Sequence, residues 1–153
     1  MFSYRICKYN PQYREKDGTY TIDEWTEFSD IGKIFCGKML TDAEYFQIES
    51  NYISCIISIL KKNNLLALRI DNLENYRNVA WENEESVPIN MLSHLLRDCL
   101  RNNCWCKLSG ADFYVHFGYD FYIYIGCLLP PSEVTLICFD NNLFCEQIDS
   151  PYN

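Results

Sequence analysis

Apolar residues recur at helical spacing between Thr41 and Asn63. Thr41 and Glu44 form a capping box, in which each side chain can accept a hydrogen bond from the backbone amide of the other residue. Lys61 and Lys62 lie at the opposite end, where the helix dipole favours positive charge. The spacing therefore predicts a long amphipathic helix. Its apolar stripe consists of Tyr45, Ile48, Tyr52, Cys55, Ile56 and Ile59.

A second helical pattern follows Pro88, a residue that suits the first turn of a helix because no amide is needed there. Arg97 and Arg101 lie toward its carboxyl end, and Asn102 and Asn103 can close it. We expect a helix over this segment. Its apolar stripe consists of Met91, Leu92, Leu95, Leu96 and Cys99.

From Cys104 onward the period of the apolar pattern changes to two, which is typical of strands. Residues 113–117 and 121–125 alternate on either side of a turn near residues 118–120, so they predict a β-hairpin with two unlike faces. One face carries Phe113, Val115, Phe117, Phe121, Ile123 and Ile125. The other face carries Tyr114, His116, Tyr122 and Tyr124.

Shorter patterns complete the chain. Strands are predicted over residues 2–8, 65–70, 133–139 and 143–148. Loops are predicted from Asn10-Pro11 to about residue 38, with a short helical turn within residues 23–32, and over residues 71–85. The whole pattern predicts an α+β fold, a mostly antiparallel sheet of about five to six strands packed with two main helices. Residues 1–153 are expected to form a single domain.

Charge and composition narrow the function classes. The net charge is −8, from 21 acidic and 13 basic residues, so the chain is not expected to bind nucleic acid through its phosphates. No signal peptide or long apolar run is evident, which predicts a cytoplasmic protein that does not bind membranes. The nine cysteines form an odd set that falls largely in apolar runs, so we expect free thiols.

Catalytic and metal-binding motifs are weak. No glycine-rich phosphate loop is present, and the thiols of Cys104 and Cys106 lack the further ligands of a metal site. We therefore expect no cofactor, no metal and no enzymatic activity. One alternative is a small cytoplasmic enzyme that uses Cys106 as nucleophile with His116 as base. A second alternative is an adaptor module that self-associates through its tyrosine face.

Acidic residues interleaved with aromatic residues are the clearest functional signal. Residues 108–153 contain six acidic residues and no Lys or Arg. Such a surface can be explained by solubility alone, but it also suits a basic protein partner, because opposite potentials steer encounter and aromatic side chains anchor contact. The candidate binding residues are Asp23, Glu24, Glu27 and Asp30 in the first loop, Glu82, Glu84 and Glu85 in the second, and Trp25, Tyr122 and Tyr124 as anchors.

Several short segments resemble the small bacterial immunity proteins that are encoded beside contact-dependent growth inhibition systems and related polymorphic toxins. These segments are residues 4–11 (YRICKYNP), 23–26 (DEWT), 29–32 (SDIG), 105–108 (WCKL), 116–120 (HFGYD) and 150–152 (SPY). The resemblance implies a cytoplasmic protein that binds the toxic domain of a cognate effector and blocks its active site. Together with the acidic charge of the chain, this role leads us to expect a monomer in a 1:1 complex with a basic nuclease, above all an RNase.

Overall fold

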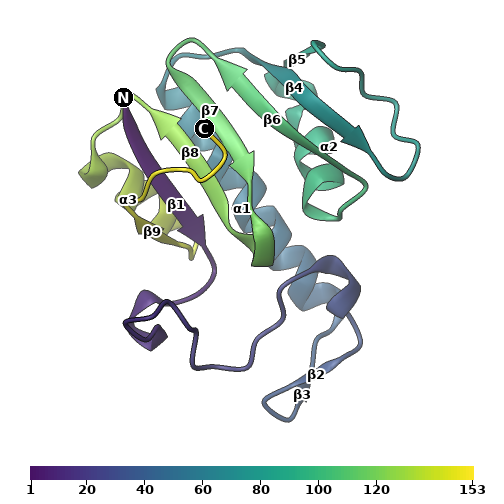
Figure 1. Ribbon diagram of the computed structural model, residues 1–153, viewed down its shortest axis with the longest axis vertical. Coiled ribbons are helices and arrows are strands. Elements are labelled where there is room, and N and C mark those ends of the chain that lie inside the picture. Colours follow the sequence, from purple (N-terminus) through teal and green to yellow (C-terminus); the bar gives the residue numbers. More distant parts are fainter.

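A computed structural model describes all residues, 1–153, as an α+β fold in which helices cover one face of an antiparallel sheet (Figure 1). The sheet has seven strands in the order β5-β4-β6-β7-β8-β1-β9. The predicted fold class is confirmed. The sheet strands are β1 (Phe2–Cys7), β4 (Ala67–Asn75), β5 (Ser86–Pro88), β6 (Cys104–Gly110), β7 (Phe113–Phe117), β8 (Ile123–Cys127) and β9 (Phe144–Glu146).

The remaining elements are three helices, a small hairpin and three short 3-10 turns. The helices are α1 (Asp42–Lys62), α2 (Ile89–Leu100) and α3 (Pro131–Asp140). The hairpin pairs β2 (Ile34–Phe35) with β3 (Lys38–Met39) and projects from the segment that joins β1 to α1 (Figure 1). The 3-10 turns are η1 (Pro11–Tyr13), η2 (Phe28–Asp30) and η3 (Tyr119–Phe121).

Local signals account for the central elements. The capping box at Thr41 forms as predicted, with both of its hydrogen bonds to Glu44 present. The predicted hairpin is formed by β7 and β8, and its Phe, Val and Ile side chains enter a core of 32 buried residues beneath the helices. Alternation along the strands thus decides which side of the sheet the helices cover, because every second residue shares a face.

Two predictions of secondary structure are wrong. Residues 133–139, predicted as a strand, belong to helix α3. Pro131 occupies the first turn, and Val134 and Cys138, four residues apart, are buried on one face while Phe139 points outward. The β-branched residues of this segment resemble a strand, but the proline pair before it starts a helix. Residues 71–85 are not one loop, because β4 continues to Asn75 through pairing with β6; the edge strand β5 begins only after this segment, at Ser86.

The sheet face opposite the helices is covered by the carboxyl-terminal tail, which crosses β7 and β8 (Figure 1). His116 Nδ1 lies 2.7 Å from the Ser150 hydroxyl, and the ring of Tyr152 packs against Trp105 and Tyr124. The tyrosine face predicted from the alternation therefore exists, but it is largely buried inside the molecule. None of the helices has both the length and the apolar character needed to span a bilayer.

Candidate protein-interaction surface

The turn η3, which joins β7 to β8, has a strained backbone. Asp120 and Phe121 both have positive φ, at 56° and 64°, a region that bulky residues rarely adopt. Two buried tyrosines hold this conformation, since the hydroxyl of Tyr9 donates to the carbonyl of Asp120 at 2.6 Å and that of Tyr52 donates to the carbonyl of Phe121 at 2.9 Å. Strain of this kind persists only where the surroundings enforce it, and it is common at functional sites.

The same turn presents an aromatic side chain to solvent. Tyr119 is 85% exposed, more than any other large hydrophobic residue in the protein. Phe121, two residues later, is buried and packs edge-on against Tyr52 with ring centroids 5.0 Å apart. The buried ring anchors the turn from below, so that Tyr119 and Asp120 project from a rigid base.

Three hollows surround this turn, with volumes of about 140, 330 and 200 Å³. Their lining residues come from the loop before η2, the end of β4, the start of β6, η3 and the carboxyl-terminal tail. No Lys or Arg lines any of the three hollows. Five acidic residues do, namely Asp23, Glu24, Glu27, Glu74 and Asp120.

Aromatic side chains fill the spaces between these acids. The largest of the three hollows is lined by Tyr76, Trp105, Phe117, Tyr119 and Tyr152. Tyr9, Tyr20 and Tyr122 line the hollow next to Asp23 and Asp120. We call the whole region, formed by the five acids and these aromatic residues around η3, the acidic–aromatic surface.

Most of the negative charge on this surface is not neutralised within the protein. Glu24 pairs with Lys8, whose Nζ lies 3.4 Å from Glu24 Oε2. The other four acids, Asp23, Glu27, Glu74 and Asp120, make no ion pair. Unpaired carboxylates beside exposed aromatic rings produce a negative potential where a partner can make apolar contact.

Three of the predicted binding residues lie largely inside the protein. Trp25 is 9% exposed and packs against Tyr45 and Phe121. Tyr124 is also 9% exposed and lies beneath the tail. Asp30 is buried as well, and it accepts hydrogen bonds from the amide of Thr26 and the ammonium of Lys33. Burial opposes ionisation of Asp30, but these donors outweigh it and lower its pKa.

The two predicted acidic groups are placed differently. Asp23, Glu24 and Glu27 lie on the acidic–aromatic surface, together with the predicted anchor Tyr122. Glu82, Glu84 and Glu85, here called the edge cluster, lie in the loop before the edge strand β5 and line none of the hollows. The loop is folded on itself, because Glu85 Oε2 accepts from the amide of Glu82 at 2.9 Å.

Cys106 and His116 are not brought together. Cys106 points into the core on the helix side of the sheet, where its sulfur lies 3.7 Å from that of Cys99. His116 is on the opposite face, bonded to Ser150, and burial followed by the nearby charge of Lys107 lowers its pKa to about 4. A thiol and an imidazole on opposite sheet faces cannot form the predicted catalytic pair.

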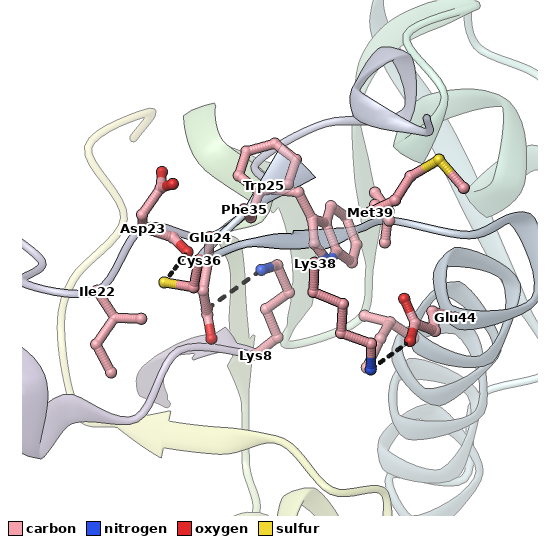
Figure 2. A pocket seen from close by; sticks show the side chains of 12 residues that line it. Lys8, Ile22, Asp23, Glu24, Trp25, Phe35, Cys36, Lys38, Met39 and Glu44 are labelled. Atoms are coloured by element: carbon pink, nitrogen blue, oxygen red, sulfur yellow. Dashed lines mark hydrogen bonds and ion pairs between the residues drawn. The ribbon is translucent and has the colours of Figure 1, made fainter. Parts of the chain in front are cut away.

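A fourth hollow, of about 450 Å³, lies between the small hairpin and α1 (Figure 2). Lys8 and Lys38 each face a carboxylate here, Glu24 and Glu44 respectively. The Lys8 ammonium also lies 4.1 Å from the centroid of the Trp25 ring, and burial lowers its pKa to about 8 although Glu24 opposes the change. This hollow shares Asp23 and Glu24 with the acidic–aromatic surface, but it is also lined by two lysines, Lys8 and Lys38.

Sequence reasoning did not name nine residues of the acidic–aromatic surface as binding residues, namely Tyr9, Tyr20, Glu74, Tyr76, Trp105, Phe117, Tyr119, Asp120 and Tyr152. The turn at residues 118–120 was itself predicted, and an aromatic residue at the tip of a hairpin turn was the available signal.

The structure contains no group of three or more His, Cys, Asp or Glu side chains arranged to hold a metal ion. Comparison with protein-family models, curated protein sequences and solved structures gave no match.

Proposed function

We propose that this protein is an immunity protein, which binds a basic toxin domain through the acidic–aromatic surface and thereby blocks the toxin's active site. The observation that carries the proposal is the group of three adjoining hollows around η3, which contain five acids, exposed aromatic rings and no base. The proposal also draws on the resemblance of several segments to immunity proteins. The protein would act in the cytoplasm, as a monomer in a 1:1 complex.

A nuclease, and in particular an RNase, is the toxin class that fits this surface best. Nucleases hold phosphates with Lys, Arg and His side chains, so their clefts attract carboxylates as well. An inhibitor that offers carboxylates on and around a rigid turn can occupy such a cleft as a mimic of nucleic acid charge. Because a free toxin is lethal to its host, the dissociation constant should be nanomolar or tighter, which corresponds to about 12 kcal/mol.

The rigidity of η3 favours tight binding. The backbone of η3 is held at the carbonyls of Asp120 and Phe121 before the partner arrives, so little backbone entropy is lost when the turn is covered. The carboxylates on the rim of the surface should set the association rate and its dependence on salt. The aromatic side chains should set the lifetime of the complex.

The test combines identification of the partner with mapping of the contact. The protein is purified from its native cytoplasm, and the bound polypeptide is identified and compared with the product of the neighbouring reading frame. We expect a basic polypeptide that arrests growth when expressed alone and is neutralised when this protein is co-expressed. A photo-crosslinking residue in place of Tyr119 should join the two proteins.

A crosslinking residue in place of Phe139 provides the matched control. Phe139 is also an exposed aromatic residue, at 75%, but it lies on helix α3, far from η3 (Figure 1). Crosslinking from position 139 and not from position 119 would place the interface on the helical side and contradict the proposed surface. An acidic partner, or one that is not neutralised, would contradict the proposed function itself.

A further inference from the structure

The hollow of about 330 Å³ on the acidic–aromatic surface has an unusual lining. Five of its eight residues are aromatic, and the only charged one is Glu74. Trp105 is half-buried in this lining, and its indole N–H donates to the carbonyl of Phe117 at 2.9 Å, which fixes the ring. The rim includes Tyr76 and Tyr119, which are 57% and 85% exposed. The hollow is therefore a ring-lined site with a single carboxylate.

The carboxylate of Glu74 is oriented but not neutralised. The hydroxyl of Tyr76 donates a hydrogen bond to Glu74 Oε2, and this bond raises the pKa of Tyr76 to about 12. Glu74 Oε1 has no hydrogen-bond partner and Glu74 has no ion pair. Lys107, two residues along β6 from Trp105, uses its ammonium to bond the carbonyl of Tyr152 instead. The carboxylate thus remains available to a ligand.

We propose that this hollow binds one arginine side chain of the protein partner. The proposal rests on the proposed function, because it specifies how the same surface recognises a basic domain. A guanidinium is planar, stacks on aromatic faces and donates two parallel hydrogen bonds to a carboxylate. An apolar side chain would bury the Glu74 charge without a neutralising positive charge, and an acidic one would be repelled. Lysine would offer a more strongly hydrated point charge with no face to stack.

The test uses the full chain and a small probe, so it needs no partner. N-acetyl-arginine methylamide is titrated into the protein while the indole N–H signals are followed by two-dimensional NMR. Trp25 and Trp81 serve as internal controls, since Trp25 lies in the core and the Trp81 indole is bonded to Asp98. We expect a saturable shift of the Trp105 signal alone, with a dissociation constant on the order of millimolar, as suits a single cation–π site.

Matched ligands and variants make the result specific. N-acetyl-citrulline methylamide has the same shape without the charge and should shift Trp105 at least about fivefold less at equal concentration. Glu74→Gln should weaken arginine binding at least about fivefold, and Tyr119→Ala should weaken it as well. Asp112→Asn removes a charge at the opposite end of the β6–β7 hairpin and should change nothing.

An absent Trp105 shift, or an equal shift with citrulline, would overturn the arginine site. Such a failure can be told apart from failure of the proposed function. If only the arginine site is wrong, a basic toxin still co-purifies and still crosslinks from position 119. If only the proposed function is wrong, the probe still binds at Trp105 but no toxin is found.

Discussion

The acidic–aromatic surface and the edge cluster have the same sign of charge but different surroundings. Around η3, carboxylates from separate chain segments lie beside exposed rings and line three hollows. In the edge cluster, Glu82, Glu84 and Glu85 follow one another in one loop, and the nearby ring of Trp81 is tied inward by a 2.7 Å hydrogen bond to Asp98. The acidic–aromatic surface offers a partner both negative charge and apolar contact area, whereas the edge cluster offers negative charge alone.

This difference shows why charge by itself is a poor guide to a binding surface. Exposed carboxylates keep a domain soluble wherever they lie, and pairs of surface charges contribute at most about 1 kcal/mol each. Tight binding requires side chains that exclude water around the charged contacts. The region with strained backbone, exposed Tyr119 and concave shape meets that requirement, and the edge cluster does not.

The largest expected effect on partner binding is the difference between two double variants that change the net charge by the same amount. Asp23→Lys with Asp120→Asn alters the acidic–aromatic surface, and Glu82→Lys with Glu84→Asn makes the same change of charge in the edge cluster. Asn is used at positions 120 and 84 because both have positive φ, which Asn tolerates. At low salt the first variant should weaken partner binding about 100-fold, or about 3 kcal/mol, and the second less than about threefold. Calorimetric titration measures both, and equal losses would show that only overall charge matters.

Truncation of the exposed ring comes next in size. Tyr119→Ala should weaken binding about 10- to 30-fold, or roughly 2 kcal/mol, mainly by faster dissociation. The free energy of unfolding should change by less than about 0.5 kcal/mol, because the ring is 85% exposed. Phe139→Ala is the control and should leave the dissociation rate unchanged. Surface plasmon resonance measures the dissociation rates, and urea unfolding measures the free energy of unfolding.

The buried tyrosines beneath η3 should matter for stability. The Tyr52 hydroxyl accepts from the amide of Lys8 at 2.6 Å and donates to the carbonyl of Phe121 at 2.9 Å. Tyr52→Phe leaves both groups unsatisfied and should lower the free energy of unfolding by about 1.5 kcal/mol. Hydrogen exchange at residues 118–122 should accelerate.

Tyr45→Phe is the matched control for that variant. The hydroxyl of Tyr45 is buried without a hydrogen-bond partner, so its removal should be neutral or slightly stabilising. Equal destabilisation by the two variants would mean that the hydroxyl of Tyr52 does not hold the turn.

The smallest predicted effect concerns pH. Burial, and then the charge of Lys107, lower the pKa of His116 from 6.5 to about 4. Because the unfolded chain binds this proton more readily than the folded one, stability is complete above pH 6.5 and declines as the pH falls toward 4. Between pH 6.5 and pH 5.5 the loss should be about 1 kcal/mol, with loosening of Ser150 and Tyr152 at the rim of the arginine hollow. His116→Gln should remove most of the dependence of stability on pH in this range. Thermal unfolding measured between pH 6.5 and pH 4 tests this prediction.

Much of the fold could be predicted because its signals are local. The capping box at Thr41 and the period-two hairpin depend on residues close together in the chain. Helix α3 was missed because its β-branched residues favour a strand. Its true character depends on burial of Val134 and Cys138, and the sulfur of Cys138 lies 3.7 Å from that of Cys55 on α1. The end of β4 was missed because its polar residues are held by pairing with β6, a contact distant in sequence.

For the binding surface, sequence alone established a negative net charge, a richness in tyrosine and a turn at residues 118–120. Tertiary structure alone decided that Trp25 and Asp30 are buried, that Cys106 and His116 lie on opposite sheet faces, and that Glu74 lies beside Trp105 and Tyr119. The physical reason is that periodicity tells which residues share a face of one element. Which faces meet depends on long-range packing of the whole chain.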